Sequence, residues 1–312
     1  MPGQGGRAAR RSRGSLSHRE REWRQPVKFS LFTLALAACS LAGCEQQPEG
    51  EPIARAQIGG GGSNGGAADD TPADEVEPTI ASQVESACRS VIFENTSLTH
   101  CLAVPARHRI ATDLSAADGG NYRSLSAFAG SHDAETIAFA MNAGMFDEEG
   151  DPIGYYVEDS DRLKTLNTAD GEGNFHLEPN GVFFGSGESW EVRTTADFLA
   201  NVSDRPEFGT QSGPMLVIDG KLHPEISSDG ESRLIRNSVG VDAKGRAHFV
   251  ISNAPISFGK LARFYRDELS VPNALYLDGN VSALWNPATG RLDTGAAIGP
   301  LIVVEKRASA EE

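Results

Sequence analysis

Cysteine is scarce in this chain of 312 residues: there are four, and no two of them have the C-x-x-C spacing of a common metal-binding motif. The seven histidines are scattered singly along the sequence. Structural zinc sites need clusters of these two residue types, so the sequence gives no support for one.

Positive charge is also in short supply. The chain has 28 Lys and Arg against 43 Asp and Glu, which gives a formal net charge of −15. A surface this acidic repels nucleic acid and anionic lipid head groups at long range, so we expect neither as a partner. An anionic substrate would have to be met by a local group of arginines.

A long apolar run is missing as well. The uncharged segment Phe29–Ala42 follows Lys28 and is too short to span a bilayer, but it has the proportions of a secretory signal. It ends in Leu41-Ala42-Gly43-Cys44, which resembles a bacterial lipobox with Cys44 as the lipidated residue. The alternative is an ordinary signal peptide with a chance cysteine.

The first 84 residues divide into two parts. We interpret residues 1–43 as a leader and signal peptide; with eight Lys or Arg and two Asp or Glu, its removal would change the net charge to −21. Residues 44–84 are rich in Gly, Pro and acids and too poor in apolar side chains to fold, so we expect a disordered tether. The predicted location is the cell envelope, at the periplasmic face of the membrane, which the protein contacts only through its lipid.

Residues 85–312 form one domain's worth of chain. Cys88 and Cys101 flank a short apolar run and a turn, so a hairpin would bring them together; we expect a disulfide, with two buried thiols as the alternative. Short β-like runs outnumber the helix signals. The runs cover Ser90–Phe93, Leu98–Val104, Arg109–Leu114, Thr136–Met141, Gly154–Val157, Gly181–Phe184, Pro214–Ile218, Ser238–Val241, Ala247–Ser252, Ala274–Leu277 and Pro300–Val304. The clearest helix signal follows Ser257, a residue type that caps helix N-termini. The predicted fold is α+β, a mixed, largely antiparallel meandering sheet with a few packed helices.

Five segments break the strand pattern with polar residues and glycine. They read NAGMFD from Asn142, PNGVFF from Pro179, QSGPMLVIDGK from Gln211, RNSVGVD from Arg236 and LYLDGNVSALW from Leu275. Taken singly, each is explained as a turn. Amide and carboxylate side chains gathered at strand ends would also suit a polyhydroxylated ligand.

The order and content of these five segments resemble the phosphodiester glycosidase family, and the resemblance covers about Cys88 to Glu305. It implies hydrolysis of a bond between a sugar anomeric carbon and a phosphate oxygen, releasing sugar and a phosphomonoester from a glycan or a small glycosyl phosphodiester. Ala143, Met145 and Asn280 depart from residues common in the family. The sugar preference therefore does not follow from the resemblance.

Such a reaction needs a carboxylate near the anomeric centre and donors for the phosphate. We predict Asp278 as the carboxylate, with Asp147 as the second candidate, and Arg236 as the phosphate ligand because guanidinium binds phosphate with two parallel hydrogen bonds. Their alternatives are turn residues and a surface salt bridge. The predicted substrate-binding residues are Asn142, Gly144, Asn180, Gln211, Asn237 and Ser282.

No cofactor is required by this chemistry, although nearby carboxylates could hold a divalent cation. The main competing function is that of a non-catalytic envelope lipoprotein that binds glycan or a partner with the same pocket. A purely structural lipoprotein is a third alternative, and it would not need these polar residues to share a site.

Overall fold

The computed structural model describes residues 86–117, 119–295 and 297–308. The predicted leader, the lipidation residue Cys44 and the tether lie outside the described residues. Within the described part, three helices are short and none is long and apolar enough to cross a membrane.

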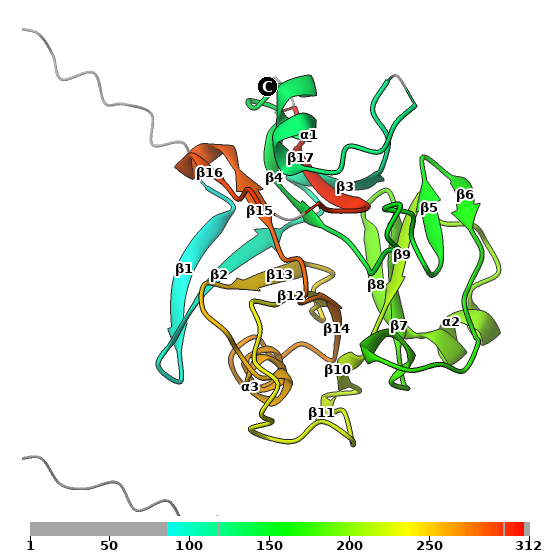
Figure 1. Ribbon diagram of the computed structural model, residues 1–312, viewed down its shortest axis with the longest axis vertical. Helices are drawn as coiled ribbons and strands as arrows, with labels where there is room; N and C mark the ends of the chain where they lie inside the picture. Colours follow the sequence, from blue (N-terminus) through cyan, green and yellow to red (C-terminus); the bar gives the residue numbers. More distant parts are fainter. Residues whose placement is uncertain (1–85, 118, 296, 309–312) are drawn as a thin grey trace, which may run out of the picture. The chain divides into compact units, whose positions relative to one another are not determined.

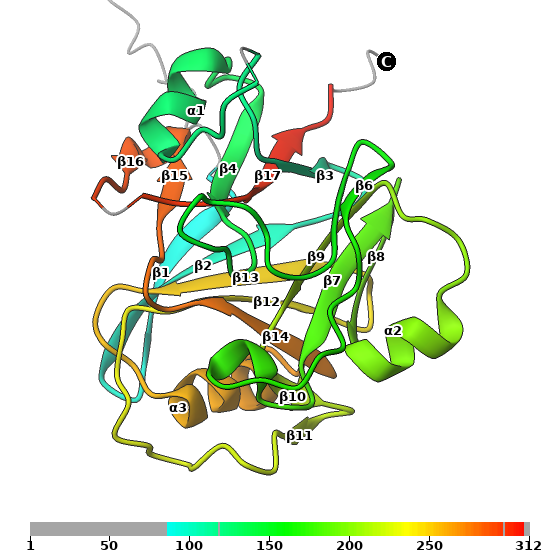
Figure 2. The same ribbon diagram turned by 45° about the vertical axis from the view of Figure 1, so that its right-hand side comes forward.

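Three antiparallel sheets form the framework (Figures 1 and 2). The first contains β1 (Cys88–Phe93), β2 (Thr96–Ala103), β10 (Met215–Ile218), β11 (Lys221–Leu222), β12 (Asn237–Val241), β13 (Ala247–Ser252) and β14 (Asn273–Asp278). The second contains β3 (His108–Asp113), β4 (Ile137–Asn142), β15 (Leu284–Asn286), β16 (Arg291–Leu292) and β17 (Leu301–Lys306). The third contains β5 (Tyr156–Glu158), β6 (Asp161–Lys164), β7 (Gly181–Ser186), β8 (Ser189–Thr194) and β9 (Phe208–Ser212).

Strand order shows that neighbours in space are often far apart in sequence. The first sheet runs β1-β2-β13-β12-β14-β10-β11, the second β16-β15-β4-β17-β3 and the third β6-β5-β9-β7-β8. All strand pairs between the described residues are antiparallel. The antiparallel character agrees with the prediction, but three sheets stand where one was expected, because strand pairing between distant segments is not encoded in local pattern.

The inner faces of the three sheets share one apolar core. Phe139 of β4, Phe183 of β7 and Phe249 of β13 are fully buried, and Phe249 lies edge-on to the other two rings with centroids 5.3 and 5.7 Å away. Each residue comes from a different sheet. Such aromatic packing adds to the burial of apolar area and fixes the sheets against one another.

Each sheet carries one helix on its outer face: α1 (Leu125–Ser131) on the second, α2 (Thr195–Asn201) on the third and α3 (Phe258–Arg263) on the first. Ser257 caps α3 as the sequence predicts, accepting a hydrogen bond from the backbone N–H of Lys260. A π-helical turn, Phe264–Glu268, continues α3. The described fold is largely β with short covering helices.

Cys88 and Cys101 are directly opposite each other in the β1–β2 pair and are joined by a disulfide. In the central strands of this sheet, β12 begins at Asn237 and β14 ends at Asp278, and these two residues are register partners. Loops between strands of different sheets meet there, and this meeting point contains the candidate site.

Candidate functional site

Asp278 lies at the end of β14 and is 6% exposed. Its Oδ1 accepts hydrogen bonds from the backbone N–H groups of Gly279 at 2.6 Å and Asn280 at 2.9 Å. Within the described part of the chain no donor contacts Oδ2. One carboxylate oxygen is thus fixed by the backbone, and the other has no donor among the described residues.

Burial raises the pKa of the Asp278 carboxyl above its ordinary value, and the backbone hydrogen bonds and the nearby Arg236 charge offset part of this effect. A carboxyl group whose pKa is raised in this way can exchange a proton closer to neutral pH than an exposed aspartate. The site therefore has the electrostatic character of an acid–base residue.

Asn237 orients the Asp278 backbone. Its Oδ1 accepts from the N–H of Asp278 at 2.9 Å, and its Nδ2 donates to the backbone oxygen of Asn142 at 2.7 Å and to the Asn142 Oδ1 at 3.1 Å. Asn142 in turn donates from Nδ2 to the Val281 carbonyl at 2.7 Å and accepts from the Ala283 N–H at 2.9 Å. Both amides are completely buried, so they position the loop after Asp278 instead of facing a ligand.

Ser282 connects this network to a cavity. Its Oγ lies 3.1 Å from the Ile235 carbonyl, 3.3 Å from Asn237 Oδ1 and 2.9 Å from the Asp278 carbonyl. A cavity of ≈ 410 Å³ is lined by Ser282 together with Gly279, Asn280 and residues of α1 and of the loop after β16. The half-buried Ser282 residue therefore forms part of the cavity wall.

Arg236 is buried at 0% exposure beside Asp278. Its Nε donates to the Ile256 carbonyl at 3.0 Å, its Nη1 to the Tyr276 hydroxyl at 3.0 Å, and its Nη2 to Ser232 Oγ at 2.9 Å. The guanidinium also lies 3.7 Å above the Phe258 ring. The sequence predicts that Arg236 binds phosphate through two parallel hydrogen bonds. In this arrangement Nε, Nη1 and Nη2 each already donate to a protein acceptor, so this bidentate contact is not available.

The absence of a side chain at Gly279 leaves room for the Tyr276 hydroxyl and the Arg236 guanidinium next to the Asp278 loop. A Cβ atom at Gly279 would lie 2.1 Å from the Tyr276 hydroxyl and 3.1 Å from Arg236 Nη1. Only glycine fits over this pair. Arg236 thus acts on Asp278 as a buried positive charge that the Tyr276 hydroxyl holds in place.

Asp147 is not part of this network. Its Oδ1 accepts from the backbone N–H of Asp151 at 2.8 Å, and its own N–H donates to the Asp151 carbonyl at 2.9 Å, which closes a tight turn. None of its hydrogen bonds among the described residues goes to the Asp278 loop. The turn alternative accounts for this residue.

Gln211 and Gly144 belong to a separate structural contact. The Gln211 side chain is 2% exposed and uses both ends: Oε1 accepts from Tyr155 and Asn167 N–H groups at 2.9 Å each, and Nε2 donates to the Asn167 carbonyl at 2.8 Å. A Cβ at Gly144 would lie 2.3 Å from the Gln211 carbonyl oxygen. These residues pack a loop onto β9 and do not face the cavity beside Ser282.

Asn180 lies at a third place. Its Nδ2 donates to the Phe175 carbonyl at 2.8 Å, and the residue lines a different cavity of ≈ 520 Å³ next to α2. Of the predicted substrate-binding residues, the structure therefore gathers Asn142, Asn237 and Ser282 around Asp278 and places Gly144, Asn180 and Gln211 elsewhere.

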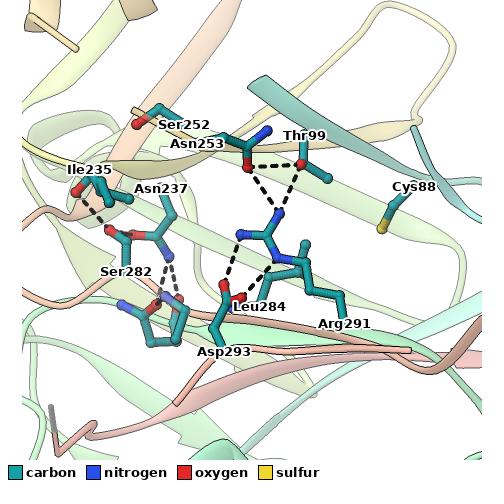
Figure 3. Close-up of polar contacts among 12 residues, drawn as sticks. Cys88, Thr99, Ile235, Asn237, Ser252, Asn253, Ser282, Leu284, Arg291 and Asp293 are labelled. Carbon is teal, nitrogen blue, oxygen red and sulfur yellow. Dashed lines mark hydrogen bonds and ion pairs between the residues drawn. The ribbon is translucent and has the colours of Figure 1, made fainter. Parts of the chain in front are cut away.

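Asp293 is a residue of this cavity that the sequence does not single out. It lines the cavity with Ser282, and its two carboxylate oxygens accept from Arg291 Nε at 2.9 Å and Nη2 at 2.8 Å. Figure 3 shows the Arg291 guanidinium between Asp293 and the pair Thr99 and Asn253, to which Nη1 donates at 2.8 and 3.0 Å. The Arg-Leu-Asp alternation after a glycine turn is the one signal for it in the sequence, and this pattern is common in strands.

A model of the phosphodiester glycosidase family matches residues 135–304, which includes Asn142, Asn237 and Asp278. The chain belongs to the phosphodiester glycosidase family. This member is 37% identical over 149 residues to the uncharacterised protein YigE of Escherichia coli (strain K12). The match covers 48% of this chain and 58% of the relative, so it spans less than two thirds of that protein's length.

Solved structures similar to this family member include two with low sequence identity. The catalytic domain of zebrafish N-acetylglucosamine-1-phosphodiester alpha-N-acetylglucosaminidase, auto-inhibited by its pro-peptide, superposes with a TM-score of 0.49 and 14% identity, covering 70% of this chain and 82% of that one. A hypothetical protein from Synechocystis gives a TM-score of 0.45 and 16% identity, covering 70% and 61%.

Among the described residues of this glycosidase-family chain, no group of three or more His, Cys, Asp or Glu is arranged to hold a metal ion. The described residues that line the cavity supply the Asp293 carboxylate and the hydroxyl groups of Ser282, Ser124, Ser126 and Thr294. The Asp278 carboxyl group and the buried Arg236 guanidinium lie next to this lining, connected to it through Ser282 and the Gly279–Val281 loop.

Proposed function

We propose that this protein hydrolyses the bond between a sugar anomeric carbon and the phosphate of a phosphodiester, with Asp278 as the catalytic carboxylate. The observation that carries the proposal is the asymmetry of Asp278: the backbone holds Oδ1, and Oδ2 has no donor among the described residues. Family membership supplies the reaction class.

The leaving phosphate is much less basic than a sugar alkoxide, so it departs without full protonation. The Asp278 carboxylate then has two tasks, which are to stabilise the positive charge that develops at the anomeric carbon and to accept a proton from the attacking water. Ser282 lines the cavity, and because its proton goes to a protein carbonyl, its Oγ accepts a hydrogen bond from a sugar hydroxyl. Arg236 holds Asp278 ionised during the reaction, because its buried charge lowers the cost of the carboxylate form.

The test is turnover of a panel of sugar-1-phosphodiesters by the full chain and by Asp278→Asn, with free sugar and phosphomonoester as readouts. Asparagine keeps an acceptor for the backbone N–H groups of Gly279 and Asn280 and removes the charge. We expect turnover to fall by about 10²-fold or more, the usual contribution of a general acid or base. The melting temperature should not fall, because asparagine removes a charge whose burial is unfavourable.

Asp147→Asn is the matched control, since Asp147 is the second candidate carboxylate and lies in a turn outside the network. It should retain full turnover. Unimpaired turnover by Asp278→Asn, or equal losses in the two variants, would contradict the proposed role.

A second function has support from the site. The described residues that line the cavity beside Ser282 include hydroxyl groups and Asp293 but no Lys or Arg, a lining that suits a neutral glycan. A non-catalytic glycan-binding protein would bind sugars in this cavity without releasing a phosphomonoester from any member of the panel. The two functions are thus separated by the same experiment.

The place of action is part of the proposal: the cell envelope, with the domain tethered to the membrane through a lipid on Cys44. The motif Leu41-Ala42-Gly43-Cys44 supports it. The full chain should fractionate with membranes, and Cys44→Ala should release it; a variant that stays with the membrane fraction would contradict lipidation.

A further inference from the structure

A second polar cavity lies at the opposite end of the seven-stranded sheet from Asp278. It has a volume of ≈ 380 Å³ and is lined by three arginines, Arg89, Arg107 and Arg246, and by two histidines, His100 and His108. None of the described residues that line it is an Asp or Glu. In a chain with a net charge of −15 the lining is locally basic, although Nε and Nη2 of Arg246 are paired with the Asp242 carboxylate just outside it.

Three buried side chains form a hydrogen-bonded row that ends at this cavity. Asp242 Oδ2 lies 3.2 Å from His248 Nε2, and His248 Nδ1 lies 3.0 Å from His100 Nε2. His100 is 3% exposed and His248 is 4% exposed. His100 is the member of the row that lines the cavity, and the described residues supply no partner for its Nδ1.

The row fixes the position of each ring proton. Burial by itself would raise the pKa of Asp242, but hydrogen bonds from Arg246, His248 and the backbone hold it at about 2, so the group is a carboxylate. A carboxylate accepts, so His248 must donate from Nε2 and accept at Nδ1, and His100 must donate from Nε2. The remaining nitrogen, His100 Nδ1, then carries a lone pair and no proton.

The groups that face His100 keep it neutral. Burial, His248, Arg89 and Arg246 together lower its pKa to about 3. Arg89 is its register partner on β1, and the same cavity is lined by Arg107, which precedes β3, and by His108, the first residue of β3. From the helical side the neighbour is Phe264, which carries no charge. The cavity thus offers guanidinium donors beside one nitrogen acceptor.

We propose that this cavity binds a phosphate monoester or inorganic phosphate as a protonated monoanion, whose P–OH group donates to His100 Nδ1 while its other oxygens accept from Arg89 and from Nη1 of Arg246, the nitrogen that does not bind Asp242. Guanidinium groups match phosphate oxygens geometrically and electrostatically. A carboxylate ion brings no proton at neutral pH, whereas the second pKa of a phosphate monoester is about 6. Phosphate is therefore the oxyanion that fits both the donors and the acceptor.

This site does not depend on the proposed glycosidase activity. Asn237 and Val241 are the two ends of β12; Asn237 contacts Asp278, and Val241 pairs with Ala247, the residue after Arg246. The two cavities therefore lie at different ends of the same strands, and binding at the second is measured without turnover.

The test is calorimetric titration of the full chain with inorganic phosphate and, separately, with sulfate at pH 6 and pH 8. Sulfate has the same shape but carries no proton at these pH values, so it cannot donate to His100. We expect saturable phosphate binding, much weaker sulfate binding, and phosphate affinity that falls by up to about tenfold per pH unit above the second pKa of phosphate, since one proton enters with each anion.

Two variants assign the binding to this cavity. Arg89→Gln changes an exposed residue on β1 and should weaken phosphate binding about tenfold through the loss of a charged hydrogen-bond donor. Arg162→Gln, at an exposed arginine on β6, has the same change in net charge and should bind as the parent does. His100→Phe keeps an aromatic ring and removes the acceptor, so any remaining affinity should no longer favour phosphate over sulfate.

The outcomes separate cleanly. Failure of phosphate to saturate, equal binding of phosphate and sulfate by the parent chain, or equal effects of Arg89→Gln and Arg162→Gln would each overturn the proposal. Because Arg89 lies on the surface, Arg89→Gln decides the question even where His100→Phe does not fold.

Discussion

Asn142 and Asn237, which are 95 residues apart and belong to different sheets, are joined side chain to side chain at 3.1 Å. Through Asn237, the end of β4 is connected to the backbone N–H of Asp278. The pair is fully buried, and every polar atom of the two amides that is described has a protein partner. It is a structural junction between the second sheet and the candidate catalytic loop.

Replacing Asn237 with alanine should therefore destabilise the fold. The change leaves the buried Asp278 N–H without its side-chain acceptor, at a cost of about 1 to 3 kcal/mol. It also removes the hydrogen bonds to Asn142, worth about 1 kcal/mol, although Asn142 Oδ1 keeps the Ala283 N–H. We therefore expect a loss of about 2 to 4 kcal/mol in the free energy of unfolding. Urea denaturation measures it. Asn201→Ala, at an exposed asparagine of α2, should change stability by less than about 0.5 kcal/mol; similar losses in both variants would contradict the role of the junction.

The contact between Gly279 and the Tyr276 hydroxyl gives a second prediction. Gly279→Ala places a Cβ 2.1 Å from that hydroxyl and should displace Tyr276, Arg236 or the Asp278 loop, with a loss of about 1 to 3 kcal/mol in stability. Gly130→Ala is the control, because the space around Gly130 in α1 is open and alanine favours the helix.

A double variant tests the mechanism of that loss. Tyr276→Phe removes the oxygen that the new methyl group would strike, so Gly279→Ala should cost less in a Tyr276→Phe background than in the parent. Additive losses in thermal or urea unfolding would show that the clash lies elsewhere.

The strands that the sequence predicts are those with continuous apolar runs. Ala247–Ser252 and Leu301–Lys306 correspond to predicted segments because both contain consecutive Val, Ile or Leu that can be buried on two faces. The strand Phe208–Ser212 is not among the predicted ones, because Thr210, Gln211 and Ser212 are polar. All three residues are buried. Their polar groups find hydrogen-bond partners in the neighbouring strands β5 and β7 and in side chains such as Thr195. The sequence of one segment does not reveal these partners.

Like the strands, the candidate site could be predicted from the sequence only in part. An aspartate directly after an apolar strand is visible in the sequence, and the structure places Asp278 at the end of β14 with the cavity beside it. The burial of Arg236 is not visible there, because its acceptors, the Ser232 and Ile256 carbonyls, come from irregular segments whose paths depend on tertiary packing. For the same reason Gln211 and Asn180, which resemble Asn142 in their side-chain amides, belong to other contacts.

The disulfide Cys88–Cys101 should contribute to stability by restricting the unfolded chain. It closes a loop with a sequence separation of 13, for which the chain-entropy model gives about 3 kcal/mol. The double variant Cys88→Ala, Cys101→Ala should lose about 2 to 3 kcal/mol in the free energy of unfolding. A reducing agent should lower the melting temperature of the parent and leave that of the double variant unchanged; a parent that does not respond to reduction would contradict this contribution.

The raised pKa of Asp113, a residue outside the candidate site, predicts that the stability of the protein depends on pH. Burial raises the pKa of this carboxyl from 3.8 to about 6, although His132, with Nε2 3.7 Å from the carboxylate, opposes the shift. The folded chain therefore holds a proton that the unfolded chain releases between about pH 4 and pH 6, and the free energy of unfolding should fall as the pH rises through this interval. Above it, the folded protein carries the cost of a partly buried charge.

Asp113→Asn should remove this cost, because asparagine has the same shape and no charge. We expect the variant to be more stable than the parent at pH 7 by about 1 to 2 kcal/mol, a value reduced from the full shift because the side chain is 23% exposed. Its stability should also vary less between pH 4 and pH 6, as measured by urea denaturation at several pH values. Asp161→Asn, at an exposed aspartate of β6, should keep the pH dependence of the parent. If the stability of the two variants depends on pH in the same way, the titrating group is not Asp113, and burial of its charge does not destabilise the folded protein.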